Sequence, residues 1–194
     1  MTLFVAAVTT ALVVSALCSL LEATLLSLTP AQVAELGGRR PGAAAIWRRF
    51  KADIERPIAA ILVLNTAAHT MGASVAGAEF ERLWGESWLL AFSLGLTYLM
   101  LQFTEILPKT LGVRYSARLA PLIARPLDAL ERAMRPVLGF IHLVNRPFER
   151  RRGAGAAPRA LEEITALASL ARITGAIDAQ QARLIQAASR LPDM

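Results

Sequence analysis

Three long apolar stretches constrain this chain more than any other feature. They cover residues 3 to 28, 57 to 78 and 87 to 107. About 20 helical residues, each rising about 1.5 Å, span the roughly 30 Å hydrocarbon core of a bilayer, so each stretch is long enough to cross it. The sequence therefore predicts an all-α integral membrane protein with three transmembrane helices.

Basic residues gather beside the ends of the apolar stretches. The segment from residue 29 to 56 holds six lysines and arginines against three acidic residues, and the chain after residue 107 is again rich in arginine. Residues 79 to 86 contain three glutamates and one arginine. The positive-inside rule then predicts an N-terminus outside and a C-terminus in the cytoplasm. This placement of charge favours anionic lipid headgroups as partners and argues against nucleic acid.

Proline and glycine residues, which begin or end helices, divide the segments between the spans into short elements. Thr29-Pro30 predicts a break and a cap for an amphipathic helix that begins near Ala31 and ends at Gly37-Gly38. Residues 43 to 55 predict an interfacial helix, and Pro57 opens the second span. The third span should end near Pro108-Lys109, because proline disrupts the helical ladder. The apolar side of the interfacial helix holds Ile46, Trp47, Phe50 and Ile54.

The remainder of the chain predicts three pieces. Four prolines interrupt residues 114 to 148, so we expect short juxtamembrane helices there, which complete a membrane domain over residues 1 to 148. Residues 149 to 159 have the composition of a basic linker. Residues 160 to 194 predict a small soluble helical hairpin, in which Asp178 and Gln181 form a capping box.

Each span carries a polar residue inside its apolar stretch: Glu22, Asn65 and Glu105. A carboxylate at the centre of a bilayer costs about 2.5 to 3.5 kcal/mol on insertion scales, so these side chains need a ligand or a partner. Counted from the predicted cytoplasmic ends of their helices, all three lie about 9 to 12 Å deep. We therefore expect one polar layer made by three helices.

Helical spacing adds further groups to this layer. Ser15 and Ser19 share a face with Glu22, and His69 shares one with Asn65. Pro108 cannot donate to the carbonyl of Thr104, which is then free to face an ion. Hydroxyl, amide, carboxylate and carbonyl oxygens suit a hard cation such as Mg²⁺.

Structural interpretations stand beside this one. Ser15, His69 and Tyr98 are expected to hydrogen-bond between helices, as polar residues in membranes commonly do. Glu22 can also be held as a neutral, hydrogen-bonded carboxyl. Two interpretations of Lys109 remain open: it either snorkels to the surface or serves as the counter-charge of Glu105.

The ordered motifs resemble those of the CNNM/CorC magnesium transporters. The resemblance lies in Ser19-Leu20-Leu21-Glu22-Ala23, in Leu64-Asn65-Thr66 and in Glu105-Ile106-Leu107-Pro108-Lys109-Thr110. The segment from Glu162 to Asp178 is similar to the acidic helical bundle of that family. Together these segments cover nearly the whole chain.

This resemblance implies a homodimer of three-span protomers in a bacterial inner membrane, without enzymatic activity. It implies an inward-facing cavity that holds Mg²⁺ for export, with Na⁺ as a candidate coupling ion. Ser19, Asn65 and the Glu105 region, including Thr104, would line the ion site. The chain departs from the family where Leu20 and Leu21 replace small residues, where His69 replaces a second asparagine, and where Thr104 replaces a glycine.

Two questions stay open at this level. A pair of CBS domains follows the acidic bundle in the family, whereas this sequence stops at Met194. Either a longer protein has been cut there or this is a short form. The alternative function is a membrane scaffold or Mg²⁺ sensor that binds the cation without moving it.

Overall fold

The computed structural model describes residues 1 to 149 and, beyond them, Ala168, Asp178, Gln180, Gln181 and Leu184. The chain divides into two compact units, Met1–Phe140 and Ile141–Met194. Within the described residues every regular element is helical. Three helices are long and apolar enough to cross a membrane: Thr2–Ser27, Glu55–Trp84 and Glu86–Arg114. The predicted all-α fold with three spans is therefore confirmed, and this is a multi-pass membrane protein.

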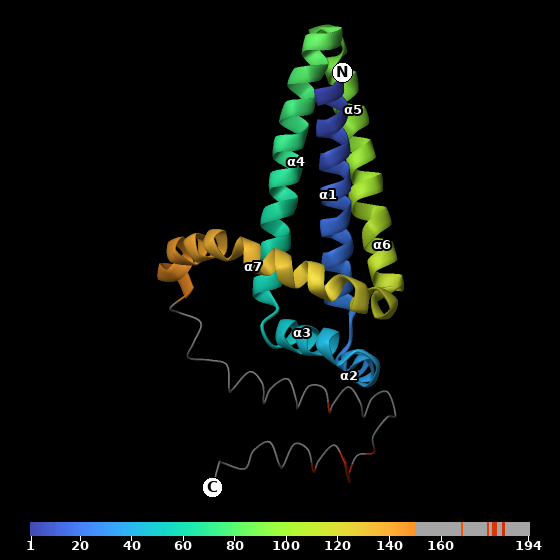
Figure 1. The fold of residues 1–194 in the computed structure, drawn as a ribbon, viewed down its shortest axis with the longest axis vertical. Coiled ribbons are helices and arrows are strands. Elements are labelled where there is room, and N and C mark those ends of the chain that lie inside the picture. The colour runs from blue at the N-terminus through green and yellow to red at the C-terminus, as the bar shows by residue number, and fades with distance from the viewer. Residues whose placement is uncertain (150–167, 169–177, 179, 182–183, 185–194) are drawn as a thin grey trace. The chain divides into compact units, whose positions relative to one another are not determined.

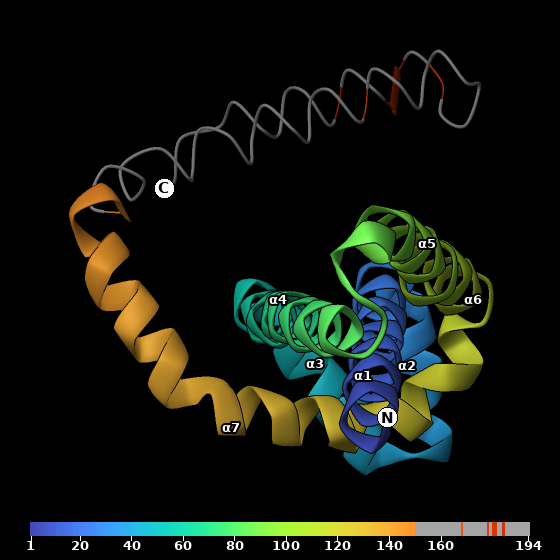
Figure 2. The same cartoon turned by 90° about the horizontal axis from the view of Figure 1, so that it is seen from above.

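Helix α1 (Thr2–Ser27) is the central span of the first unit. It packs against α4 (Glu55–Trp84) on one side and against the lower half of the third span on the other. Figures 1 and 2 show the three spans side by side, close together at the N-terminal end of α1 and farther apart at its C-terminal end. The third span consists of a 3₁₀ turn (Glu86–Trp88), α5 (Leu89–Met100), a π-helical segment (Leu101–Ile106) and α6 (Leu107–Arg114).

The third span does not end at Pro108, so that prediction is wrong. Wider π-helical turns precede the proline, and the Leu107 amide donates to the carbonyl of Gln102, five residues back. Because the ladder has already shifted register, the missing N–H of Pro108 is accommodated within one continuous helix. The chain stays helical to Arg114.

Two short helices follow α1: α2 (Pro30–Arg39) and α3 (Pro41–Ala52). Thr29 caps α2 in a reciprocal capping box with Gln32, as the break at Thr29-Pro30 predicted. However, α2 continues through Gly37-Gly38 instead of ending there. It ends before Pro41, because proline disfavours helical geometry at the residue before it.

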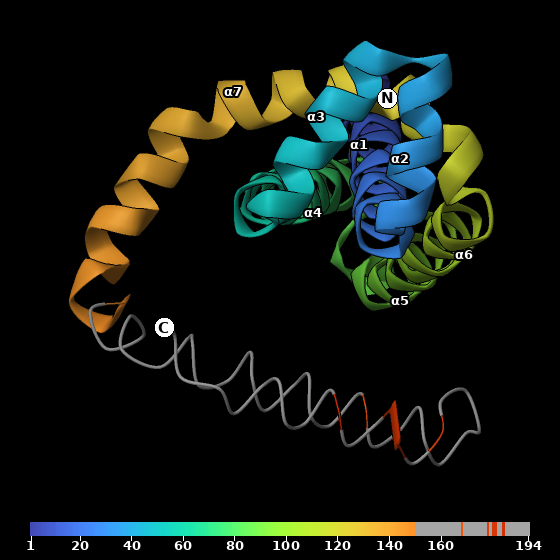
Figure 3. The same ribbon diagram turned by 90° about the horizontal axis from the view of Figure 1, so that it is seen from below.

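The buried core lies at the C-terminal end of α1. Trp47 and Phe50 on α3 are fully buried against Leu25 of α1, in agreement with the predicted apolar side of this helix. The Trp47 Nε1–H donates to the carbonyl of Ala120 at 2.9 Å, so the indole is both packed and hydrogen-bonded. Figure 3 shows α2 and α3 across this end of the spans.

Ala120 belongs to α7 (Ser116–Glu149), a single helix where several short ones were expected. The prediction was wrong because each proline removes one donor and bends a helix without having to end it. Up to Phe140 one side of α7 is buried through Ala120, Ala124 and Leu127. Apolar side chains are also exposed on α7, among them Leu122, Val137 and Phe140.

Charged contacts fasten α7 to α3. Arg49 Nη2 lies 2.8 Å from a carboxylate oxygen of Glu131 and also contacts Asp128. Both carboxylates are buried, and they have further partners on α7 itself in Arg132 and Arg135. We call Arg49, Asp128 and Glu131 the α3–α7 latch.

A lysine on α3 also reaches α1. Lys51 Nζ donates to the carbonyl of Leu25 at 2.7 Å, near the end of α1 where carbonyls lack partners in the helix. Burial lowers the pKa of the Lys51 amine. This contact gives a partner to a buried carbonyl in the last turn of α1.

Part of the predicted tail is visible in the second unit. The Asp178 carboxylate accepts from the Gln181 amide at 2.7 Å, and the Gln181 side chain accepts from the Asp178 amide at 3.0 Å. The predicted capping box is confirmed. The linker at 150 to 159 and the other residues of the expected acidic bundle lie outside the described residues, so the predicted domain boundaries there stay predictions.

Candidate functional site

Four polar side chains meet in the middle of the three spans. Ser15 lies near the midpoint of α1 and is fully buried. Its Oγ donates to Asn65 Oδ1 on α4 at 2.7 Å and contacts His69 Nε2, also on α4. Thr104 of the π-helical segment is fully buried with its Oγ1 3.4 Å from the same His69 nitrogen. We call Ser15, Asn65, His69 and Thr104 the polar cluster.

Small residues bring α1 and α4 close enough to form these hydrogen bonds. A Cβ atom added at Gly72 would lie 2.3 Å from the Cβ of Ala11, so an alanine does not fit there without a shift of the helices. Gly72 follows His69 by less than one turn, and Ala11 precedes Ser15 by four residues. The small-residue spacing of Ala68, Gly72 and Ala76 therefore explains how the backbones approach at the cluster.

The π-helical segment supplies the third wall. Thr104 Oγ1 donates to the carbonyl of Met100 at 2.7 Å, which fixes the hydroxyl within its own helix. The expected helix break at Pro108 is not observed, because the helix continues through this residue. The hydroxyl of Thr104 faces the polar cluster, and the role of its carbonyl as an ion ligand stays a prediction. Pro108 itself is buried, and the π-helical register before it accommodates its missing N–H.

Ser19 lies one turn beyond Ser15 on α1. Only 1% of it is exposed, and its Oγ has no hydrogen-bond partner among the described residues. A buried hydroxyl without a partner is uncommon in native proteins, since it loses its hydrogen bonds to water without replacement. An oxygen in this condition suits a ligand that enters between the helices.

Glu22 does not belong to the layer of Asn65, so the expected single layer is corrected. Asn65 bonds to Ser15, which precedes Glu22 by seven residues, or about 10 Å along the helix. The equal depths assumed helix ends that differ from the observed ones. Measured from Ser27, Glu55 and Arg114, the residues Glu22, Asn65 and Glu105 lie about 8, 15 and 14 Å deep.

Lys109 is the counter-charge of Glu22 rather than of Glu105. Its Nζ lies 3.4 Å from Glu22 Oε2, and both side chains are partly exposed. The two helices touch just beyond this pair, where a Cβ at Gly112 would lie 2.9 Å from the carbonyl oxygen of Leu20. The pair therefore neutralises one of the two intramembrane glutamates.

Glu105 lines a separate cleft between α4 and the third span. The cleft has a volume of about 370 Å³ and shares His69 with the polar cluster. In this cleft a carboxylate lies together with neutral polar groups. Its walls are formed by His69, Thr70, Ala73, Thr97, Met100, Leu101 and Glu105.

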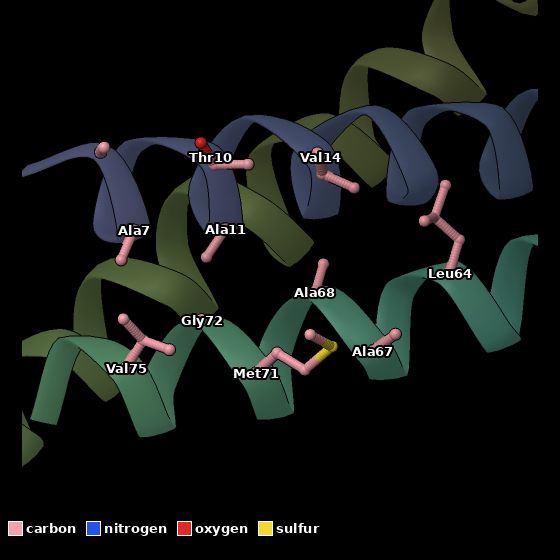
Figure 4. Close-up of a pocket in the computed structure, with 11 residues that line it drawn as sticks. Ala7, Thr10, Ala11, Val14, Leu64, Ala67, Ala68, Met71, Gly72 and Val75 are labelled. Atoms are coloured by element: carbon pink, nitrogen blue, oxygen red, sulfur yellow. The ribbon is translucent and has the colours of Figure 1, made fainter. Parts of the chain in front are cut away.

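A larger groove between α1 and α4 is apolar. It has a volume of about 460 Å³, and Figure 4 shows Ala7, Ala11 and Val14 facing Ala68, Gly72 and Val75 across it. Its one hydroxyl is that of Thr10, so it offers almost nothing to a cation. The groove is a packing feature and not an ion site.

The expected interhelical role is confirmed for Ser15 and His69 but not for Tyr98, which is 66% exposed on α5. Sequence reasoning missed the contact between Thr104 and His69, and that between Lys109 and Glu22. The signal for the second was present, since Glu22 and Lys109 are the two intramembrane charges nearest to the same end of their spans.

The chemistry available here is that of neutral oxygens. The described residues contain no group of three or more His, Cys, Asp or Glu side chains that could hold a metal ion. Ser15, Ser19, Asn65 and Thr104 offer hydroxyl or amide oxygens, while Glu105 and His69 are the ionisable neighbours. Such a set suits a hard cation that is released again better than a tightly held resident ion.

Comparison with known proteins gives consistent results. A family model, the cyclin M transmembrane N-terminal domain, matches residues 6 to 181. The UPF0053 protein sll1254 of Synechocystis is 33% identical over 190 residues, which cover 98% of this chain and 54% of that protein. Two chloroplastic DUF21 domain-containing proteins of Arabidopsis thaliana are each 27% identical over 123 residues, which cover 63% of this chain and 18% and 19% of those proteins. The chain thus spans about half the length of the Synechocystis relative.

Proposed function

Since this chain belongs to the family of the cyclin M transmembrane N-terminal domain, we propose that it is the membrane module of a CNNM/CorC-type Mg²⁺ transporter. The module has no enzymatic step. It provides a route on which the ion exchanges water for protein oxygens and then leaves. The observation that carries this proposal is the buried polar cluster at mid-span, with the unpartnered Ser19 hydroxyl one turn away.

Oxygen chemistry supports Mg²⁺ as the transported ion. Mg²⁺ keeps several waters and takes few protein ligands, so a cluster of neutral oxygens with one carboxylate nearby is sufficient. Ser19 and Asn65 would supply oxygens in place of part of the water shell. Glu105 would supply negative charge from the adjacent cleft, while Lys109 already offsets that of Glu22.

The shape of the bundle favours access from one side. The spans lie close together at the N-terminal end of α1 and farther apart at the other end (Figure 1). With the N-terminus outside a bacterial inner membrane, the wider end would face the cytoplasm, and export would require the narrow end to open. Na⁺ is a candidate coupling ion for this export. We further propose that two copies of the chain form a homodimer. Anionic lipid headgroups would contact the basic residues of α3 and α7.

Flux of Mg²⁺ into proteoliposomes tests the proposal. We expect uptake by the wild type and loss of most of it in Asn65→Ala and Glu105→Gln, because each change removes an oxygen ligand or a charge. Ser93→Ala is the matched control, since Ser93 lies within the third span but is exposed and bonds only to its own helix. Equal flux in all four proteins would refute the assignment of the site.

The rival function gives a different result in the same experiment. A cation-binding scaffold or Mg²⁺ sensor would bind Mg²⁺ in a calorimetric titration, with weaker binding in Asn65→Ala, yet would pass no ion in either direction. Binding without flux would therefore replace transport with sensing while leaving the site in place.

A further inference from the structure

Both hydroxyl groups that contact His69 already donate their protons to other acceptors. Ser15 Oγ donates its proton to Asn65 Oδ1 at 2.7 Å, and Thr104 Oγ1 donates its proton to the carbonyl of Met100 at 2.7 Å. A hydroxyl has one proton to donate and two lone pairs that accept. Toward His69, both oxygens can therefore act only as acceptors.

This arrangement fixes the tautomer of the neutral imidazole. Since Ser15 and Thr104 both present lone pairs to His69 Nε2, that nitrogen must carry the hydrogen. The lone pair of the ring then sits on Nδ1. Nδ1 has no hydrogen-bond partner in the part of the chain that the structure describes. A histidine held by its Nε2–H, with Nδ1 left as a lone pair, is in the state in which histidines bind metals.

A carboxylate lies in the same cleft. His69 and Glu105 come from different helices and both line the cleft of about 370 Å³ between α4 and the third span. Thr70 and Thr97 add hydroxyl groups to its wall. Because one water takes up about 30 Å³, the cleft has room for a cation and several of its waters.

We infer that His69 Nδ1 and Glu105 bind a first-row divalent transition metal, such as Mn²⁺ or Zn²⁺, in this cleft. The inference rests on the proposed function, since it extends the range of ions at the same polar region. Imidazole is a good ligand for these metals, whereas Mg²⁺ strongly prefers oxygen. His69 thus widens the substrate class of this chain beyond Mg²⁺.

Pulsed EPR of bound Mn²⁺ tests the nitrogen ligand directly. The full chain, freed of any affinity tag, is prepared as His142→Gln, which leaves His69 as the one histidine in the sequence. We expect nuclear modulation from a directly bound nitrogen, and a change in its frequency when histidine is labelled with ¹⁵N. This measurement leaves the cleft and the polar cluster unaltered. Bound Mn²⁺ without nitrogen modulation would overturn the inference.

Ion affinities provide the second measurement. We expect His69→Asn to weaken Mn²⁺ and Zn²⁺ binding by about tenfold or more, the loss typical when a metal ligand is disturbed, and to change Mg²⁺ binding much less. Thr110→Val is the control, because it removes a hydroxyl from the third span outside the cleft. An equal loss for all three ions would overturn the inference, because His69 would then support cation binding without acting as a ligand selective for transition metals.

The two proposals can fail separately. Mg²⁺ flux without a nitrogen-bound Mn²⁺ would overturn the inference and leave the proposed function intact. A nitrogen-bound Mn²⁺ in a protein that passes no Mg²⁺ would do the opposite. Absence of both metals from the wild type would overturn both.

Discussion

The two ends of the span bundle are held together by different forces. At the N-terminal end of α1, four aromatic rings from all three spans pack together: Phe4, Phe80, Trp84 and Phe92. Phe80 and Phe92 stack with their centroids 4.2 Å apart. At the other end the contacts are directional, with the Glu22–Lys109 pair, the Trp47 hydrogen bond and the α3–α7 latch.

This difference shows which end can change its spacing at lower cost. Within lipid, aromatic contacts contribute through packing, because lipid tails are as apolar as the rings they would replace. Hydrogen bonds and ion pairs fix a register, since separating them leaves polar groups without partners. We therefore expect the aromatic end, which we call the gate, to open during transport. The polar end, which we call the frame, is expected to keep its spacing.

The largest expected effect is at the frame. Trp47→Ala removes a fully buried indole and its hydrogen bond to Ala120, and should lower the free energy of unfolding by about 3 to 5 kcal/mol. Trp88→Ala is the control, because Trp88 is 65% exposed. Denaturation in mixed micelles, followed by circular dichroism, measures both. Equal losses of unfolding free energy in the two variants would show that Trp47 contributes no more to stability than an exposed tryptophan does.

Close helix crossings give the next effect and compare the two halves of α1. Gly112→Ala would place a Cβ 2.7 Å from Ala23 Cβ, and also against backbone atoms of α1, so we expect a loss of about 1 to 3 kcal/mol. Gly72→Ala meets the Ala11 methyl and should also destabilise. Gly77→Ala has nothing within 4 Å and should be neutral or slightly stabilising. The same unfolding measurement ranks the three, and a destabilised Gly77→Ala would contradict this account.

The latch tests whether charge contributes at the frame. Arg49→Ala leaves Asp128 and Glu131 without their partner on α3, but both keep an arginine on α7. Because the Arg49 side chain is half exposed, we expect a loss of about 1 to 2 kcal/mol rather than the larger cost of a fully buried pair. Arg48→Ala, on the same helix, should change stability less. A larger loss of stability in Arg48→Ala than in Arg49→Ala would show that the α3–α7 latch does not stabilise this end of the bundle.

The smallest effect is expected at the gate. A double-mutant cycle of Phe80→Ala and Phe92→Ala should give a coupling energy of about 0.5 to 1.5 kcal/mol for the stacked pair. If this end opens during transport, Phe80→Ala should also raise Mg²⁺ flux. Unchanged flux together with the expected coupling would make the rings a structural contact and not a gate.

Local patterns predicted local structure well. The length of the apolar stretches gave the three spans, Thr29 and Gln32 form the expected cap, and the spacing of Trp47 and Phe50 gave the buried side of α3. These features depend on neighbours within a few residues, so the sequence contains what determines them.

Features that depend on where helices end or cross were predicted less well. Pro108 and the prolines of α7 were expected to end helices, yet the π-helical register and bending kept the backbone continuous. The depth of Glu22 relative to Asn65 was wrong for a different reason: α1 and α4 pack in a register that pairs Asn65 with Ser15, and residue counts along single helices do not contain that register. The polar cluster itself was partly predicted, since Asn65 and His69 share a face, but its link to Thr104 depends on tertiary packing.

The hydrogen bonds of the π-helical segment Leu101–Ile106 span five residues instead of four, so the segment contains one residue more than an α-helix would place there. If that surplus were absorbed, everything after Ile106 would rotate by about 100° about the helix axis while α5 stayed in place. Lys109 would then swing away from Glu22 and release a carboxylate at the wide mouth of the bundle. Absorbing the extra residue of this six-residue segment would thus couple a backbone change in the middle of the membrane to the charges at its edge.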